Sequence, residues 1–234
     1  MVAVGLAPSP LAHMLLELAE RGADGTMEVG GRGLVLRAGA LVDIDPGPDD
    51  QALEEFLVRT GRLEPDAAAS CRATAEARGV RVETVIAENH LVRAKALSEA
   101  RRALLLDRLV RGLAAEEIMG REPPAFDPSP PPATDADPIA LVPLLLDALS
   151  RRAGEEDAGA VGERASDHLI WVRGPHLEPA LRWSGLGKEA IDGPVSRFLA
   201  RDPGAPSKIA ALVRARLAHL ATEGAPPPPP ARPS

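Results

Sequence analysis

The chain is poor in aromatic residues and in cysteine. Its 234 residues include no Tyr, three Phe and two Trp, so Ala, Leu and Val must fill its cores. Such small side chains bury little apolar surface each, and at about 25 cal/mol per Å² we expect modest stability for each folded unit. Cys71 is the only cysteine, which excludes an intrachain disulfide bond and gives no indication of an oxidising compartment.

Long apolar runs are also missing. No run approaches the roughly 20 residues that a membrane-spanning helix requires. Residues 1–18 contain neither Lys nor Arg, and Glu17 follows soon after the apolar positions, which is unlike a secretory signal. The sequence therefore predicts a cytoplasmic protein with no membrane partner.

Positive charge is in short supply. The net charge of −7 makes nucleic acid an unlikely partner for nonspecific binding by the whole chain. Residues 1–58 carry three Arg against ten acidic residues, whereas residues 59–121 carry twelve basic and nine acidic residues. Solvated charged faces are the simpler interpretation, and attraction between the two segments or to different partners is the alternative.

Apolar spacing and turn signals predict an α+β fold that opens with one helix and a small β-meander. The helix is expected over residues 9–21, with Ser9 as its N-cap. Strands are expected over residues 25–29, 34–37 and 40–44, with a tight turn at Gly30-Gly31. Since so small a meander needs a cover, we expect the helix to pack on it within one α/β module, residues 1–60.

A weak repeat of 29 residues follows the meander. Phe56–Leu63 aligns with Val85–Val92, and each half consists of a short helix, a turn and a longer helix. This pattern predicts a helical bundle over residues 61–122, packed on the first module through a helix that ends at Thr60. Phe56 and Leu57 are expected in the shared core.

Proline divides the rest of the chain. Residues 123–137 are predicted to be a Pro-rich linker, residues 138–224 a mostly helical domain, and residues 225–234 a disordered Pro-rich tail. Within the helical domain we expect a loop over residues 153–165 and a strand over residues 168–172. Helices are expected from Asp137-Pro138 and near residues 178–183, 194–200 and 206–220.

The first module resembles the PATAN domain of bacterial signalling proteins over about residues 9–60. The match consists of the Leu15–Leu18 helix, Gly25–Val29, Leu36–Val42 and Gln51–Leu57. This family often has an aromatic residue on its second strand, where this chain has Leu36. The last third resembles, more loosely, the C-terminal part of long PATAN proteins, in which Asp192-Gly193 precedes a short helix. That resemblance implies a winged-helix-like unit.

The helical repeat, about residues 51–113, resembles a degenerate N-terminal domain of type II secretion and type IV pilus assembly ATPases. Some of these domains bind cyclic di-GMP through two repeated motifs. Here the apolar scaffold is retained, but Glu54 and Glu83 stand where the family has glycines that approach the nucleotide. Ala52 replaces an arginine, and Ala75 and Leu104 replace glutamines. The resemblance therefore implies the fold without its ligand.

No catalytic, cofactor-binding or metal-binding residue is predicted. Gly185–Lys188 lacks the other features of a phosphate loop, and the five histidines lack partners at ligand spacing. The acidic pair of Asp43 and Asp45 is expected at a turn, and Cys71 is expected to pack within a helix. Ser166-Asp167-His168 are adjacent residues, which do not converge as a triad.

We therefore expect a non-catalytic bacterial signalling adaptor or scaffold, not an enzyme and without cofactors, that acts through protein–protein contacts. Its expected partners are a response regulator, a motor ATPase or a polarity protein, in motility or type IV pilus control. A winged-helix DNA-associated regulator is the alternative, and a cyclic di-GMP sensor is a weaker one. The DNA-associated alternative would use a group of basic residues for phosphate contacts: Arg93, Lys95, Arg101, Arg102, Arg108 and Arg111.

Overall fold

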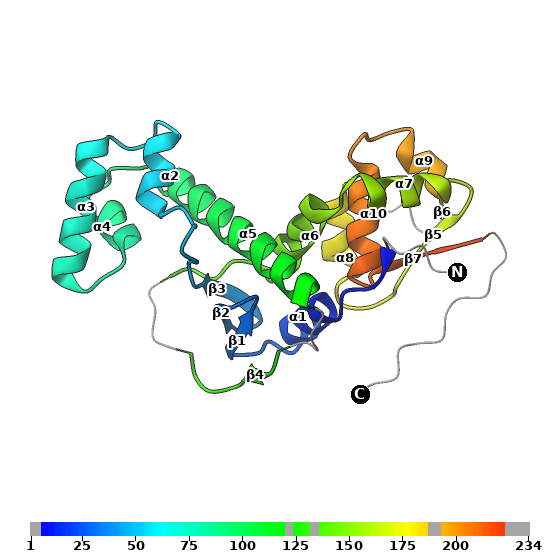
Figure 1. Cartoon of the computed structure of the whole chain (residues 1–234), viewed down its shortest axis with the longest axis horizontal. Helices are drawn as coiled ribbons and strands as arrows, with labels where there is room; N and C mark the ends of the chain where they lie inside the picture. Colours follow the sequence, from blue (N-terminus) through cyan, green and yellow to red (C-terminus); the bar gives the residue numbers. More distant parts are fainter. Residues whose placement is uncertain (1–5, 120–123, 132–135, 187–192, 223–234) are drawn as a thin grey trace. The chain divides into compact units, whose positions relative to one another are not determined.

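The computed structural model describes residues 6–119, 124–131, 136–186 and 193–222. In these ranges helices combine with two small antiparallel sheets, so the predicted α+β class is confirmed (Figure 1). The chain forms two compact units. Residues 24–139 form the central unit, and residues 1–23 together with residues 140–234 form the terminal unit. This division differs from the predicted boundaries at residues 60, 122 and 137, and the Pro-rich tail at 225–234 lies outside the described residues.

The first helix, α1 (Pro10–Glu20), belongs to the terminal unit. Its N-cap is Ser9, as predicted, because the Ser9 side chain accepts a hydrogen bond from the Ala12 N–H at 3.2 Å. The helix packs against α6 (Leu141–Arg152), and the backbone N–H of Ser9 donates to the Arg214 carbonyl at 2.8 Å. The expectation that this helix covers the meander is thereby corrected. Apolar spacing shows that a helix has a face to bury, but it does not identify the surface that covers this face.

The predicted meander is confirmed as β1 (Gly25–Val29), β2 (Arg32–Arg37) and β3 (Ala40–Ile44), all antiparallel. Helix α5 (Ala94–Met119) packs against β1 and β3 and supplies the missing cover (Figure 1). Helix α5 approaches the meander closely at Gly30, whose φ is +58°. The Gly30 N–H donates to Glu116 Oε1 at 2.7 Å. A Cβ atom there would lie 2.5 Å from the Gly112 carbonyl oxygen, so this position requires glycine.

Residues within the predicted linker and just after it pair with this sheet. Phe126–Asp127 forms a two-residue strand, β4, beside β1, and gives the sheet the order β3-β2-β1-β4. Ile139 pairs with Leu41 at the opposite edge through two backbone hydrogen bonds of 2.9 and 2.7 Å. A Pro-rich segment can pair in this way because both positions lie at sheet edges, where fewer backbone donors are needed.

The bundle of the central unit repeats with a period of 29 residues, as predicted. Its helices are α2 (Leu53–Arg59), α3 (Pro65–Arg78), α4 (Val82–Glu88) and α5. Adding 29 to the first residue of α2 gives that of α4, and the same step leads from α3 to α5. Each pair of equivalent core positions is buried: Leu57 with Ile86, Leu63 with Val92, Ala68 with Leu97 and Cys71 with Ala100.

The bundle core does not include the meander. Leu57 is fully buried within it, but Phe56 is only partly buried, and the Arg59 guanidinium lies 5.3 Å from its ring centroid. The prediction that Phe56 and Leu57 lie in a core shared with the meander is therefore wrong, although Leu57 belongs to the core of the bundle. The connection between the two layers is α5, which contacts α2 and α4 as well as β1 and β3.

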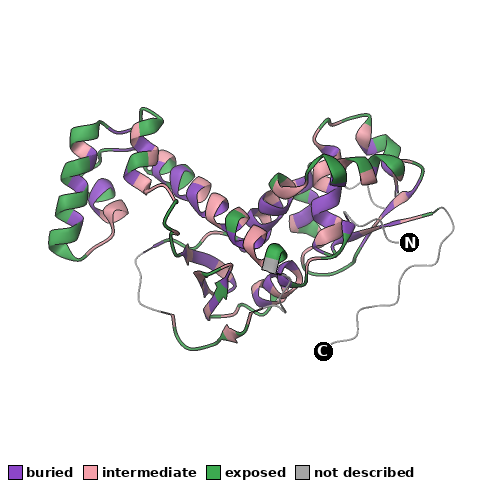
Figure 2. Ribbon diagram, viewed as in Figure 1, coloured by how far each residue is buried: buried purple, intermediate pink, exposed green. Residues whose placement is uncertain are grey.

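The terminal unit surrounds α10 (Ala205–Arg214), which packs on α6 and on α7 (Glu155–Glu163). Buried residues line the facing sides of α6 and α10 (Figure 2). The expected loop at residues 153–165 is wrong, because α7 forms there. Gly154 is its N-cap, Asp157 accepts the Gly154 N–H at 3.3 Å, and Val161 is buried.

A three-stranded sheet completes the terminal unit. Its order is β6-β5-β7, with β5 (His168–Trp171) at the centre, β6 (Gly193–Pro194) and β7 (Ala218–Ala221) at the edges, and α8 (Leu177–Ser184) after β5. The predicted helix near residues 206–220 ends at Arg214, and the chain continues as β7. Helices α9 (Val195–Leu199) and α10 connect β6 to β7, so these two strands do not form the hairpin of a wing.

Candidate interaction site in the helical repeat

An arginine–glutamate pair occurs at equivalent positions of the two repeats. In the first, Arg72 Nε on α3 donates to Glu54 Oε1 on α2 at 2.8 Å. In the second, Arg101 Nε on α5 lies 3.5 Å from Glu83 Oε2 on α4. Adding 29 to Glu54 and Arg72 gives Glu83 and Arg101. Both carboxylates lie in the first turn of their helix, where the helix dipole stabilises negative charge.

Each pair borders a groove between a short helix and the longer helix that follows it. The α2–α3 groove has a volume of about 330 Å³, and the α4–α5 groove has one of about 350 Å³. The first is lined by eight residues: Glu54, Glu55, Val58, Arg59, Pro65, Ala68, Ala69 and Arg72. The second is lined by the eight equivalent residues: Glu83, Thr84, Ala87, Glu88, Ala94, Leu97, Ser98 and Arg101. The repeat therefore builds the same groove twice.

The turn that follows each short helix is also the same in both repeats. Gly61 and His90 occupy equivalent positions with φ of +66° and +53°. The residues before them, Thr60 and Asn89, each donate a side-chain hydrogen bond to the carbonyl four residues earlier, at 2.9 and 2.8 Å. His90 lines the α4–α5 groove, in a backbone conformation that glycine adopts more easily.

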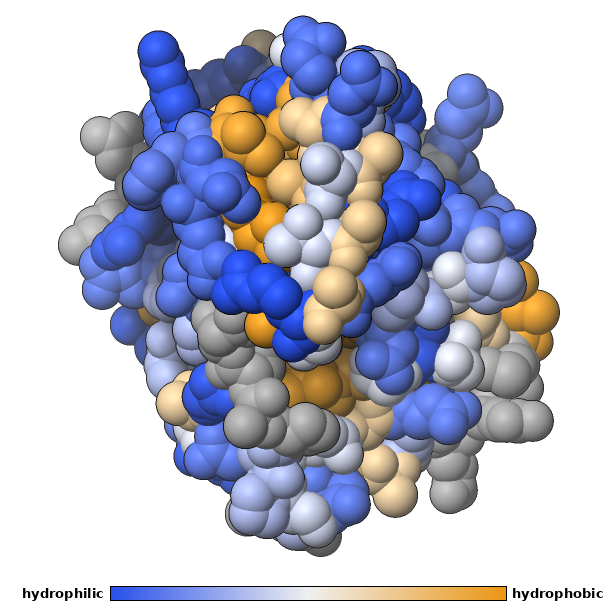
Figure 3. Space-filling view, turned by 90° about the vertical axis from the view of Figure 1, so that its left-hand side faces the viewer, coloured by the Kyte–Doolittle hydropathy of each residue, from blue (hydrophilic) through white to orange (hydrophobic). Residues whose placement is uncertain are grey.

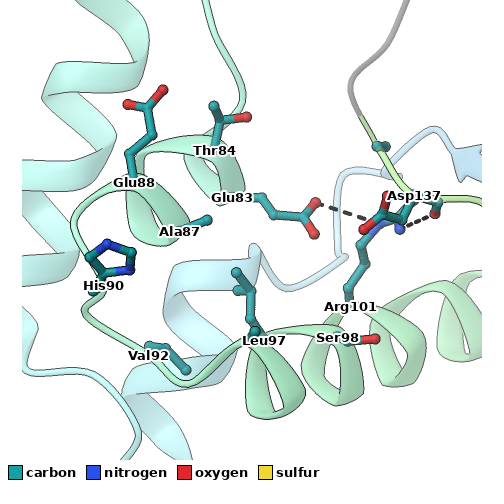
Figure 4. A pocket seen from close by; sticks show the side chains of 12 residues that line it. Glu83, Thr84, Ala87, Glu88, His90, Val92, Leu97, Ser98, Arg101 and Asp137 are labelled. Atoms are coloured by element: carbon teal, nitrogen blue, oxygen red, sulfur yellow. Dashed lines mark hydrogen bonds and ion pairs between the residues drawn. The ribbon is translucent and has the colours of Figure 1, made fainter.

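The two grooves differ in what lies at their arginine. Arg101 Nη1 donates to the Asp137 carbonyl oxygen (Figure 4). Its Nη2 donates to the Val42 carbonyl oxygen. Ala136 and Asp137 line the groove there, and Ala136 is buried. Arg72 instead donates only to the carboxylates of Glu54 and Glu55, and within the described chain no backbone carbonyl accepts from it.

The two arginines therefore differ in their exposure to solvent. The side chain of Arg101 is 7% exposed, whereas that of Arg72 is 49% exposed. The hydrogen bond from Arg72 to Glu54, together with the charge of that carboxylate, raises the pKa of the guanidinium above its ordinary value. Arg72 therefore carries a full charge at neutral pH.

Arginines on α5 also donate hydrogen bonds to backbone carbonyls of the edge strand β3. Arg108 Nη1 donates to the Ile44 carbonyl at 2.9 Å, and Arg108 Nε lies 3.6 Å from the buried carboxylate of Asp50. Arg32 pairs with the same carboxylate, and the Gly47 N–H donates to it at 2.9 Å. Burial alone would raise the pKa of Asp50, but the hydrogen bonds from Arg32 and Gly47 and the nearby positive charges hold it below its ordinary value.

The other residues singled out in the sequence form ion pairs or are buried. Asp43 pairs with Arg81 at 2.8 Å, and Asp167 pairs with Arg164 at 2.6 Å. Cys71 is buried, and burial followed by the charge of Glu54 raises the pKa of its thiol. Gly187 and Lys188 lie outside the described residues. Among the residues that are described, no three or more His, Cys, Asp or Glu side chains come together as a metal site.

Sequence reasoning missed one cluster in the terminal unit. His13, Glu17, Glu20 and His176 line a cavity of about 180 Å³, although His176 is far from the others in the sequence. His176 Nε2 lies 3.0 Å from the Leu16 carbonyl oxygen, and His13 Nε2 lies 3.4 Å from Glu17 Oε1. Only the packing of α1 within the terminal unit brings these residues together, so no local pattern could have indicated them.

Comparison with known proteins adds no relative. Neither a protein-family model, nor a curated protein, nor a solved structure matches this chain. Within the described ranges, no helix combines the length and the apolar character needed to cross a bilayer.

Proposed function

We propose that this chain is a non-catalytic bacterial signalling adaptor that binds other proteins through the helical bundle of its central unit. The observation that carries the proposal is the α2–α3 groove. It is lined by α2 and α3 alone, whereas an extended segment of the same chain helps to line its equivalent between α4 and α5. Since Ala136 and Asp137 line one end of the α4–α5 groove, the equivalent α2–α3 groove is suited to receive a peptide segment from another protein.

The surface beside this groove favours contact with a protein. The outer side of α3 exposes small side chains, namely Ala69, Ser70, Ala73, Thr74 and Ala77. Figure 3 shows that a strip of apolar and weakly polar side chains crosses this side of the molecule between hydrophilic ones. Small side chains permit close approach of a partner backbone and lose little conformational entropy on binding.

The family resemblances support the same function. A PATAN-like meander and a degenerate bundle of the pilus ATPase kind both point to bacterial signalling, with a response regulator, a motor ATPase or a polarity protein as partner. The pathway would be motility, polarity or type IV pilus control. A cytoplasmic location accords with these partners.

The alternatives have less support from the geometry. Of the basic residues available to a DNA-associated regulator, Arg101 and Arg108 are largely buried and donate to carbonyls of β3. A cyclic di-GMP sensor would have to place phosphates beside Glu54 and Glu83, whose charges repel them. Both carboxylates are already paired with arginine.

A photo-crosslinking experiment tests the adaptor function. A benzophenone amino acid replaces Ala69 in the α2–α3 groove or, as the matched control, its repeat equivalent Ser98 in the α4–α5 groove. Irradiation in living bacteria should give a discrete crosslinked protein from position 69 and none from position 98. Equal crosslinking from both positions, or none from position 69, would contradict the proposal.

A further inference from the structure

We infer that the α2–α3 groove binds an extended segment of a partner protein that presents a small apolar side chain followed by a backbone carbonyl, which accepts a hydrogen bond from Arg72. This inference rests on the proposed adaptor function and specifies its ligand. The chain itself supplies the template, because Ala136 and Asp137 line the equivalent groove and the Asp137 carbonyl accepts from its arginine (Figure 4).

The template defines the contacts. At the end of the α4–α5 groove, Arg101 donates to the carbonyl oxygen of Asp137, while the buried Ala136 lines the cavity beside it. The ligand therefore presents a small apolar side chain followed by a main-chain acceptor.

Arg72 has the geometry to repeat this contact. It occupies the position equivalent to Arg101, and its Nε donates a hydrogen bond to a first-turn glutamate, Glu54, the equivalent of the Glu83 that lies 3.5 Å from Arg101 Nε. The pairing orients its guanidinium, while 49% of the side chain remains accessible to solvent. Two nitrogens of Arg101 donate hydrogen bonds to main-chain carbonyls, whereas no nitrogen of Arg72 donates to a carbonyl of the described residues. The first groove thus has the donor without the acceptor.

Shape specifies the partner further. The floor of the α2–α3 groove is apolar, with Val58, Pro65 and Ala68 on it, and suits a small side chain such as alanine. The charged part of its lining is balanced, with Glu54 and Glu55 against Arg59 and Arg72, so the ligand is recognised through its main chain.

A peptide titration tests the inference. The probe is a fluorescein-labelled synthetic peptide with the sequence of residues 127–140, added to the full chain and followed by fluorescence anisotropy. Arg72→Ala should weaken binding about tenfold, as expected for loss of charge-assisted hydrogen bonds. Ala69→Arg, which fills the groove without removing the donor, should weaken it at least as much. The matched control is Arg62→Ala, which removes another exposed bundle arginine that lines neither groove and should leave the affinity within about twofold.

Three results would overturn the inference. The first is the absence of binding at peptide concentrations up to about 1 mM. The second is binding that neither Arg72→Ala nor Ala69→Arg weakens. The third is self-association of the full chain that Ala69→Arg abolishes in sedimentation velocity, which would assign the groove to a second copy. A peptide that fails to bind while position 69 still crosslinks a protein would reject this ligand and leave the adaptor function standing.

Discussion

Arg101 Nη2 donates a hydrogen bond to the carbonyl oxygen of Val42, and this bond attaches the long helix α5 to the edge strand β3. The same guanidinium donates to the Asp137 carbonyl and faces Glu83. One buried side chain therefore joins the meander, the bundle and the segment that follows β4. Its repeat equivalent, Arg72, donates to two carboxylates of α2 and is half exposed, so the two arginines should differ sharply in their effect on stability.

We expect Arg101→Ala to lower the free energy of unfolding of the central unit by about 3–5 kcal/mol, because it removes a buried cation beside Glu83 together with the donor to two backbone carbonyls. Arg72→Ala should have a much smaller effect, since water replaces the contacts of an exposed pair. Urea unfolding followed by circular dichroism measures both variants. Similar losses for the two substitutions would show that Arg101 does not hold the central unit together.

Leu57 and Phe56, both on α2, should differ in how much they contribute to the free energy of unfolding. Leu57→Ala should cost about 2–5 kcal/mol, because Leu57 is fully buried in the bundle core. Phe56→Ala should cost less, because part of the ring already faces water. Hydrogen–deuterium exchange of α2 and α4 in the two variants compares these effects directly. A larger loss of protection for Phe56→Ala would contradict the packing described above.

Deletion of residues 1–23 should destabilise the terminal unit. Both tryptophans of the chain, Trp171 and Trp183, belong to that unit, so their fluorescence reports its unfolding alone. Loss of α1 exposes the apolar face of α6, and the tryptophan transition in urea should move to lower concentration. An unchanged tryptophan transition would instead support the expectation that α1 belongs with the meander.

Asp50 should make the stability of the central unit depend on pH in acid. Its folded pKa lies below the reference value of 3.8, so its contribution to stability is fully present above pH 3.8 and is lost as the pH falls through the folded pKa. Asp50→Asn should therefore destabilise the unit by the same amount at pH 7 and pH 5. The difference from the wild type should shrink only in stronger acid. A difference that already disappears between pH 7 and pH 5 would show that the Asp50 pKa is not lowered.

The sequence predicted the elements of the central unit better than their partners. The three strands and the 29-residue repeat follow from local patterns, since turn glycines and apolar spacing act over short distances. Local patterns could not predict that α1 packs in the terminal unit, because more than one apolar surface of the chain could cover the apolar face of this helix. Gly154 and the acidic residues after it suggested a loop, but the cap formed with Asp157 and the burial of Val161 stabilise α7 instead.

The grooves could have been found from the sequence in part. Glu54 and Glu83 were interpreted only as substitutions that repel a nucleotide. Extending the 29-residue comparison to Arg72 and Arg101 would have revealed a repeated pair of opposite charges. The contact between Arg101 and Asp137 had no such signal, because it depends on the return of the chain along the bundle.

The most direct test of the account is a measurement of which repeat responds to the ligand. The full chain, labelled with ¹⁵N, is titrated with the unlabelled peptide of residues 127–140, and the amide chemical shifts are followed by NMR. The account predicts shift changes concentrated in residues 53–78, which form α2 and α3, and their loss in Arg72→Ala. Shift changes concentrated instead in residues 82–101, or in the terminal unit, would contradict it.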